Sequence, residues 1–282
     1  MLDLTVIILT KNEESNIEKC IKSVKEIASR IVVVDSFSTD STKLVCKKLG
    51  VDFYENLFTS HANQFNWALS NVNVTTKWTM RMDADEELTI ELIEELKEKL
   101  DSIKGNINGI VLKRRVYFMG KWIKHGGMYP QKLLRIWRTG FGTYEKKLMD
   151  EHIILKQGKS ITLKYDFIDN NNKDLTWWTN KHNWYSDKET VDYFRLEEQI
   201  SQEDVMTGEI FAGQAKNKRW IKNKVYYKTP LFSRALIYFL YRYIIRLGFL
   251  DHKEGLIFHF LQGFWYRFLV DAKIHEAKVL KK

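Results

Sequence analysis

The sequence predicts an α/β protein whose first half forms a parallel, doubly wound sheet. Short β-branched runs, such as residues 4–9 and 31–34, alternate with segments whose apolar residues recur at helical spacing. This alternation is typical of parallel strands connected through helices. The chain has 282 residues, of which 44% are hydrophobic, so it holds enough apolar side chains for one large core and an appendage.

The alternating half is predicted from apolar spacing and from capping residues. Asp40 or Ser41 precedes the second helix as a candidate cap, and Thr89 precedes the fourth. In chain order we expect a strand at residues 4–9, a helix at 14–27, a strand at 31–34, a helix ending at Leu49, strands at 51–54 and 78–82 around a short helix at 63–69, and a helix that reaches Leu100.

The second half has a different character. Residues 107–118 and 132–138 are predicted strands joined by a loop rich in glycine and aromatic residues, and residues 174–198 are predicted to be helical. From Lys216 the chain becomes basic and then strongly apolar and aromatic. We therefore predict one domain over residues 1–215, with two parts that meet near residue 105, and a basic and aromatic helical region over 216–282.

Charge and cysteine usage narrow the class of protein. The net charge is +9, and the excess of lysine and arginine lies in the middle and toward the C-terminus. Cys20 and Cys46 occupy apolar helix positions, so we expect buried thiols in a reducing compartment. The start of the chain carries no basic and apolar signal segment, which predicts a cytoplasmic protein. No nucleic-acid-binding module is recognised, and we expect no nucleic acid partner.

Polar clusters occur after three of the predicted strands and within the short helix at 63–69. They comprise residues 10–14, residues 35–42, the pair Gln64 and Asn66, and residues 83–87. Each cluster taken alone also fits an ordinary turn or helix cap. Doubly wound sheets bind ligands beyond the carboxyl ends of their strands, so the clusters together indicate a ligand site.

Asp83 and Asp85 form the most informative pair. They follow a predicted buried strand and are separated by one residue. Mg²⁺ and Mn²⁺ take oxygen ligands, commonly one or two protein carboxylates together with substrate phosphates. The alternative interpretation is a solvated acidic turn.

Three motifs in register resemble glycosyltransferase family 2. They are VIILTKNEE at residues 6–14, IVVVDSFSTDST at residues 31–42 and DAD at residues 83–85. The resemblance is narrower to the branch of lipopolysaccharide-core glucosyltransferase-like enzymes. It covers about the first 155 residues and continues more loosely to the end. It implies a GT-A fold, in which a Rossmann-like mixed sheet is flanked by helices, here with a C-terminal amphipathic helical extension.

The resemblance also implies roles for individual residues. Asp35 would bind a uracil-like base, Asp83 would contact the ribose or the metal, and Asp85 would bind Mn²⁺ or Mg²⁺. Phe37 departs from the family pattern, which commonly has glycine there. The residues expected to bind the nucleotide sugar are Thr10, Asn12, Glu13, Asp35, Gln64, Asn66 and Asp83.

Members of this family invert the configuration at the anomeric carbon. One general base must therefore take the proton from the hydroxyl group of the acceptor. The resemblance implies that Asp150 or Glu151 is this base. Glu151 is favoured slightly, because a Glu–His pair is common at this position in relatives. An acidic loop that caps the next element is the alternative.

The loop at residues 117–130 is the expected site of donor sugar and acceptor. Trp122, His125 and Tyr129 offer rings and hydrogen-bonding groups, and Gly126 and Gly127 permit close backbone approach. Further along, Arg135 and Arg138 fit either phosphate pairing or a solvated strand face. His182 fits a third metal ligand or, more commonly, a core histidine.

The C-terminal region suggests contact with a membrane. Basic residues at 216–228 precede an apolar and aromatic stretch at 231–250, in which three arginines fall on one arc of a helix: Arg234, Arg242 and Arg246. A helix with one cationic stripe and a broad apolar face lies in a membrane interface and does not span it. Residues 256–270 continue the pattern. A helical hairpin packed on the catalytic domain is the alternative.

Together these observations predict a metal-dependent, inverting hexosyltransferase. It would move a sugar from a nucleoside diphosphate, most simply UDP, to a membrane-associated glycan or glycolipid of bacterial surface polysaccharide or lipopolysaccharide. It would work as a peripheral protein on the inner face of the cytoplasmic membrane, whose anionic surface would be a partner. The oligomeric state is not predicted. The alternative function is a non-catalytic nucleotide-sugar-binding or membrane-surface protein on the same fold.

Overall fold

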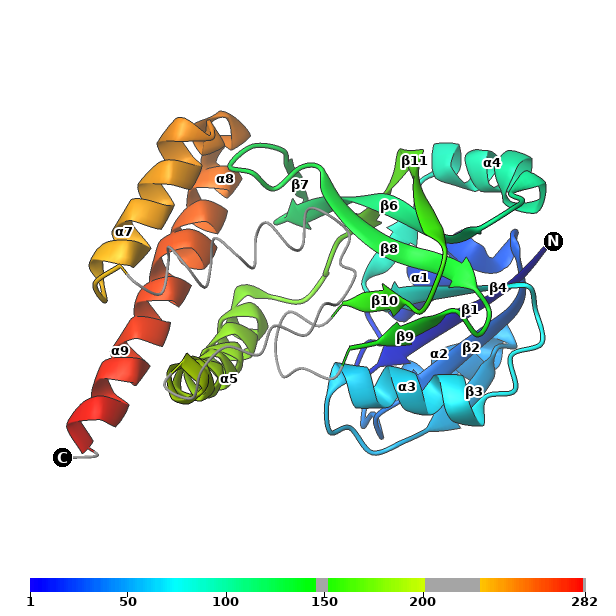
Figure 1. The fold of residues 1–282 in the computed structure, drawn as a ribbon, viewed down its shortest axis with the longest axis horizontal. Helices are drawn as coiled ribbons and strands as arrows, with labels where there is room; N and C mark the ends of the chain where they lie inside the picture. The colour runs from blue at the N-terminus through cyan, green and yellow to red at the C-terminus, as the bar shows by residue number, and fades with distance from the viewer. Residues whose placement is uncertain (146–151, 201–228, 281–282) are drawn as a thin grey trace. The chain divides into compact units, whose positions relative to one another are not determined.

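The computed structural model describes residues 1–145, 152–200 and 229–280 (Figure 1). The chain divides into two compact units. Unit 1 comprises Met1–Gly120 and Tyr129–Asn172, and unit 2 comprises Lys121–Met128 and Lys173–Lys282. The predicted domain boundary near residue 215 and the basic stretch at 216–228 lie outside the described residues.

Unit 1 is built on a mixed sheet. Its strands run in the order β3 (Asp52–Glu55), β2 (Ala28–Asp35), β1 (Leu2–Thr10), β4 (Trp78–Asp83), β8 (Gln131–Arg138), β6 (Ile107–Phe118), β11 (Lys159–Asp169) and β5 (Glu86–Leu88). The first four strands are parallel, as the alternation of strands and helices predicts. Beyond β4 the strand β8 is antiparallel to both of its neighbours, and β6 and β11 are again parallel.

The register of the parallel strands places the predicted polar clusters at one edge. Thr10 at the end of β1 lies opposite Asp35 at the end of β2. On the other side of β1, Leu9 lies opposite Asp83, the last residue of β4. Because parallel strands end on the same side of a sheet, the first, second and fourth clusters meet there.

Helices bury both faces of the sheet. The helices α1 (Ile17–Lys25), α2 (Thr42–Leu49) and α4 (Ile90–Lys99) pack on the face that carries Leu4, Val6 and Ile8. The helix α3 (His61–Asn71) packs on the opposite face, against Ile7 and Leu9. Neighbouring strand residues therefore alternate between two cores, as the pleat requires. Cys20 and Cys46 are buried free thiols, as predicted.

Short elements complete unit 1. The helix α4 begins after Thr89, whose side chain accepts the backbone N–H of Leu92, so the predicted cap is confirmed. A 3-10 turn at Leu100–Ser102 follows α4. The strands β9 (Gly142–Tyr144) and β10 (Ile153–Leu155) form an antiparallel pair that the sequence analysis did not anticipate.

In its described residues, unit 2 is helical apart from the short strand β7 (Lys121–Ile123) and connecting turns. The helices described there are α5 (Leu175–Ile200), α7 (Ser233–Leu240), α8 (His252–Phe258) and α9 (Tyr266–Leu280), with π turns at Tyr241–Ile245 and His259–Trp265 and a 3-10 turn at Gly248–Asp251. The apolar stretch expected as one helix over 231–250 is thus interrupted. Leu247 and His252 have φ near 59°, a left-handed conformation that ends a helix.

The arginines of this stretch do not form the predicted cationic stripe. Arg234 and Arg242 have only 2% and 3% of their surface exposed. Arg234 pairs with the buried Asp271, and Arg242 donates to the backbone oxygen of Gly126 and to Gln262. Of the three, only Arg246 is exposed. The prediction was wrong because helical spacing shows that the arginines share a face but not which face is buried.

The opposite face of this stretch is apolar and exposed. Its exposed residues recur at helical spacing and include Leu236, Ile237, Leu240, Tyr241, Ile244 and Ile245, each with 42–69% of its surface accessible. Among the described residues, no helix has both the length and the apolar character needed to cross a bilayer.

Candidate nucleotide and metal site

A hydrogen-bonded pair joins the ends of β1 and β2. The Thr10 hydroxyl donates to Asp35 Oδ2 over 2.7 Å. The backbone N–H of Ser38 donates to Asp35 Oδ1 over 2.6 Å, and its hydroxyl donates to Oδ2. Asp35 is 1% exposed, so its carboxylate is fixed by three donors of the chain itself. Three such bonds hold the carboxylate at a defined orientation at the sheet edge.

The loops that follow these strands are fastened to each other. Asn12 donates its backbone N–H to the Ser38 hydroxyl, and its side-chain oxygen accepts the N–H of Thr39 over 2.8 Å. The backbone N–H of Glu13 donates to Thr42 Oγ1 over 2.8 Å. Thr10, Asn12, Glu13 and Asp35 are therefore brought into one cluster.

Lys11, which the sequence analysis did not single out, and Phe37 shape the second loop. Lys11 reaches across and donates to the carbonyl oxygens of Ser36 and Phe37 over 2.9 and 2.6 Å. Phe37 has φ of 59°. This left-handed conformation favours glycine, which explains why the family commonly has glycine at a position where this chain carries an exposed phenylalanine.

The side chains of Gln64 and Asn66 both connect α3 to other segments by hydrogen bonds, but to different ones. Gln64 is buried, donates to Ser36 Oγ over 3.1 Å and accepts from Asn56 over 2.8 Å. Asn66 donates to the carbonyl of Tyr144 and accepts its N–H, at 3.1 and 3.0 Å. Gln64 therefore supports the loop after Asp35, whereas Asn66 fastens β9 to α3. Their roles at a nucleotide stay predictions.

Asp83 is engaged with two arginines. Arg81 Nη2 lies 2.6 Å from Asp83 Oδ1, and Arg135 Nη2 lies 3.5 Å from Oδ2. Burial alone would raise the pKa of Asp83, but the guanidinium groups of Arg81 and Arg135 outweigh it and hold the pKa well below its ordinary value. Asp83 is therefore a carboxylate whose charge the protein itself compensates.

Arg135 is not part of a solvated strand face, which was one of its two predicted settings. It is 2% exposed and bridges Asp83 and the buried Glu86. Burial raises the pKa of Glu86, an effect that Arg135 opposes and Asp83 reinforces. Arg138 is also internal: it donates to the carbonyl oxygens of Ile103 and Ile107 and stacks over Trp78.

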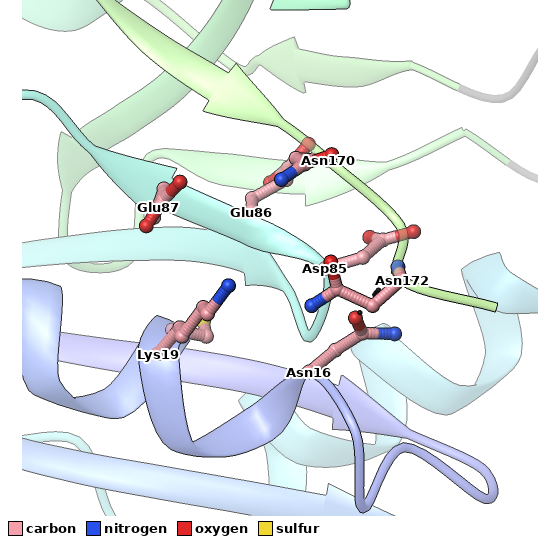
Figure 2. A pocket seen from close by; sticks show the side chains of 8 residues that line it. Asn16, Lys19, Asp85, Glu86, Glu87, Asn170 and Asn172 are labelled. Carbon is pink, nitrogen blue, oxygen red and sulfur yellow. Dashed lines mark hydrogen bonds between the residues drawn. The ribbon is translucent and has the colours of Figure 1, made fainter. Parts of the chain in front are cut away.

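Asp85 has a different environment. It is partly exposed, and its Oδ2 accepts the side-chain N–H of Asn171 over 2.9 Å. Its backbone oxygen accepts the N–H of Asn170, also at 2.9 Å. Figure 2 shows Asp85 beside Asn170, Asn172 and Asn16 on the wall of a small pocket. Asn171 is neutral, so its hydrogen bond leaves the negative charge of this carboxylate in place.

The carboxylates of Asp83 and Asp85 fit a six-coordinate divalent cation that takes most of its other ligands from water and phosphate. Within the described ranges, no cluster of three or more His, Cys, Asp or Glu side chains could hold a metal by itself. Mg²⁺ is commonly bound by one or two carboxylates plus substrate phosphates. Asp85 suits that arrangement, whereas the assignment of Asp83 to the metal stays a prediction on a carboxylate that already has cationic partners.

The predicted bases, Asp150 and Glu151, lie outside the described residues. The residues on either side of them are joined, because Glu145 donates its N–H to the carbonyl of His152 over 3.0 Å and His152 donates its N–H to Glu145 Oε1 over 3.1 Å. Glu145 and His152, which flank residues 146–151 in the sequence, are thus hydrogen-bonded to each other next to the β9–β10 pair. Glu145, which is buried, was not foreseen from the sequence.

The loop residues Trp122, His125 and Tyr129 are distributed over the two units. In unit 1, the Tyr129 hydroxyl lies 3.1 Å from both carboxylate oxygens of Asp166, which also pairs with Arg115. In unit 2, His125 Nδ1 lies 2.7 Å from Asp251 Oδ1. Also in unit 2, the Lys124 ammonium lies over the Trp122 ring.

Asp251 holds the His125 loop at several points. Besides the imidazole contact, Asp251 accepts the backbone N–H groups of Lys124 and His125 over 3.2 and 2.8 Å. A carboxylate can only accept, so Nδ1 of His125 is the donor in this contact.

The chain was also compared with known protein families. The family model for glycosyl transferase family 2 matches residues 5–170, more than half of the chain. The chain belongs to glycosyl transferase family 2. Its membership confirms the resemblance drawn from the three motifs, and its mixed sheet flanked by helices agrees with the expected GT-A fold.

Several curated proteins that are similar to this family 2 member are glycosyltransferases. An uncharacterized glycosyltransferase of Rickettsia bellii is 37% identical over 94 residues, which is 33% of this chain and 31% of the relative. One from Rickettsia typhi is 26% identical over 99% of this chain and 89% of the relative. The lipopolysaccharide core biosynthesis glycosyltransferase LpsC of Rhizobium meliloti is 32% identical over 51% and 54%. The chain thus spans about a third of the first of these relatives and about half of LpsC.

Among solved structures, glucosyl-3-phosphoglycerate synthase from Mycobacterium tuberculosis, in complex with Mn²⁺, UDP and glucosyl-3-phosphoglycerate, is 18% identical to this family 2 member. The match covers 40% of this chain and 44% of that one, with a TM-score of 0.34.

Proposed function

We propose that this chain is an inverting glycosyltransferase that uses a nucleoside-diphosphate sugar, with UDP as the nucleotide. The observation that carries the proposal is the sheet edge of a family 2 chain where Thr10, Asp35 and Asp83 end three parallel strands in register. That edge is where doubly wound sheets bind nucleotides.

The donor nucleotide is assigned to the cluster that joins the first two strand ends. Asp35 is buried and oriented by Thr10 and Ser38, so a base that approaches it meets a fixed acceptor. Glu13 precedes α1 by four residues and is partly exposed. Orientation by several donors lets a carboxylate select one hydrogen-bonding edge of a base, because it need not reorganise on binding.

The diphosphate is assigned to the Asp85 side of the same edge. A Mn²⁺ or Mg²⁺ ion bound by Asp85 would neutralise the charge that develops on the departing diphosphate. The chain's own contribution is to present one partly exposed carboxylate there. Glu151 or Asp150 is assigned as the base that accepts the proton of the acceptor hydroxyl. Glu145 and His152, which flank residues 146–151 in the sequence, are hydrogen-bonded to each other.

The acceptor is proposed to be a membrane-associated glycan or glycolipid, as in lipopolysaccharide or surface polysaccharide synthesis. The similarity to LpsC supports this class of acceptor. The exposed apolar face of unit 2 supports a place on the inner surface of the cytoplasmic membrane. That face carries Leu240, Ile244 and Ile245, and the exposed Arg246 follows it in the sequence. Apolar side chains beside a cation suit the interface of an anionic bilayer.

Calorimetric titration with UDP, with and without Mn²⁺, tests the donor assignment. The wild-type chain is expected to bind UDP more tightly when Mn²⁺ is present, and Asp85→Ala is expected to abolish that dependence. Glu91→Ala, which removes an exposed carboxylate from α4, is the matched control and should behave as the wild type. If UDP binds equally with and without metal, the metal assignment fails. If no nucleoside diphosphate binds, the chain is a membrane-surface protein on an inherited fold.

A further inference from the structure

A run of three asparagines follows β11 and contacts the turn that carries Asp85. Asn170 donates its backbone N–H to the carbonyl of Asp85, and Asn171 donates its side-chain N–H to the carboxylate, both at 2.9 Å. The next residue, Asn172, donates its backbone N–H to Asn16 Oδ1 over 3.0 Å. The run therefore connects the Asp85 turn with the beginning of α1 (Figure 2).

Asn16 is the second half of this connection. It is only 2% exposed, and both ends of its amide are used. Its oxygen accepts from Asn172, and its nitrogen donates to Glu13 Oε2 over 2.8 Å. A buried amide satisfied at both ends has a fixed orientation, because rotating it would leave two polar groups unpaired.

We propose that Asn16 and Asn171 are positioning residues that hold the base-binding and metal-binding halves of the donor site in one arrangement. The proposal rests on the function proposed above. Asn171 orients the carboxylate of Asp85, and Asn16 orients that of Glu13. Asn172 joins the two through its backbone, so three hydrogen bonds and the covalent backbone between Asn171 and Asn172 connect Glu13 to Asp85.

The neutrality of Asn171 is what suits it to this task. An amide N–H can fix one oxygen of Asp85 while leaving the negative charge in place for a cation. Asp83, in contrast, is paired with the guanidinium groups of Arg81 and Arg135. Hydrogen bonds to a ligating carboxylate set its orientation, and their loss typically lowers metal affinity by about 10-fold or more.

The test measures binding and not turnover. The Kd of Mn²⁺ is measured in saturating UDP by electron paramagnetic resonance of free Mn²⁺, and the Kd of UDP by calorimetry without metal. Asn171→Ala is expected to raise the Kd of Mn²⁺ by about 10-fold and to leave metal-free UDP binding within about twofold. Asn16→Ala is expected to weaken both, because it frees Glu13 as well as the asparagine run.

Asn172→Ala is the matched control, since it keeps the backbone N–H that reaches Asn16 and loses only a side-chain contact with the carbonyl of Ser15. It should bind both ligands as the wild type does. Asn171 is partly exposed, so Asn171→Ala tests the proposal even if Asn16→Ala does not fold. Unchanged Mn²⁺ affinity in Asn171→Ala, or an equal loss in Asn172→Ala, refutes the positioning role. A wild-type chain that binds neither UDP nor Mn²⁺ refutes the proposed function itself, and this role with it.

Discussion

His182 lies on α5 among aromatic rings, and its setting predicts how the stability of unit 2 depends on pH. Its ring stacks on Trp178 with centroids 3.5 Å apart and meets Tyr266 edge-on at 5.4 Å. Its Nδ1 lies 2.9 Å from the carbonyl oxygen of Trp178. Burial, which outweighs that hydrogen bond, lowers the pKa of His182 from 6.5 to about 4. We therefore interpret it as a core histidine and not as a metal ligand.

The sign and size of the effect follow from linkage. The folded state holds His182 neutral down to about pH 4, whereas the unfolded chain takes up a proton below its ordinary pKa of 6.5. The stability that this residue contributes is therefore present above pH 6.5 and is lost as the pH falls toward 4. Between about pH 7.5 and pH 5 the loss from this residue amounts to about 2 kcal/mol.

His182→Phe removes the titrating group and keeps an aromatic ring. Urea unfolding of both proteins, followed by tryptophan fluorescence at several pH values, is expected to show about 2 kcal/mol less loss of stability in the variant on acidification. His275→Phe, which replaces an exposed histidine of α9, is the control and should keep the wild-type pH dependence. Identical slopes for the wild type and His182→Phe would refute the reasoning. Loss of metal-dependent UDP binding in His182→Phe would contradict the assignment of the residue to the core.

Two further predictions concern unit 2. Asp251→Asn weakens the contacts to the His125 loop and should lower the free energy of unfolding by roughly 2 kcal/mol. Asp187→Asn, at an exposed ion pair, should change it by less than about 1 kcal/mol, and equal effects would contradict the role of Asp251 in holding the loop. Replacing Ile244 and Ile245 together by serine should weaken the affinity for anionic liposomes, measured by sedimentation, by at least about 10-fold. Leu57→Ser, at an exposed leucine of unit 1, should leave that affinity unchanged. Unchanged sedimentation of the double variant would exclude the exposed apolar face of unit 2 as the lipid contact.

The parallel half of the fold was predictable because its signals are local. The strands β1 and β2 contain continuous apolar runs, and caps such as Thr89 mark where helices begin. The meeting of Thr10 with Asp35 also follows from the sequence, since both residues end neighbouring parallel strands. The strand β11 was missed although its charged and apolar residues alternate over residues 163–167, as in a half-buried strand, and β5 was missed because three residues are too short to show a period.

What the sequence could not supply is the partner of each charge. The sequence analysis allowed Arg135 either to pair with a phosphate or to lie on a solvated strand face. Its partner in the structure is Glu86, which lies 49 residues away in the chain. Arg234 finds Asp271 at a separation of 37 residues. Spacing along one helix or strand contains no information about such pairs. The run of asparagines at 170–172 was visible as a pattern, but its meaning depends on the turn that it contacts.

The charges at the sheet edge explain why Asp85, and not Asp83, is expected to respond most to metal. Asp83 remains ionised because Arg81 and Arg135 lower its pKa, but the same two guanidinium groups repel any further cation brought to that carboxylate. Asp85 is partly exposed and is held by neutral amides. A divalent ion therefore gains the full attraction of one carboxylate at Asp85, whereas at Asp83 it would first have to compete with two fixed positive charges. Under the proposed function the paired aspartates therefore have different tasks: Asp83 pairs with Arg81 and Arg135, and Asp85 binds the metal.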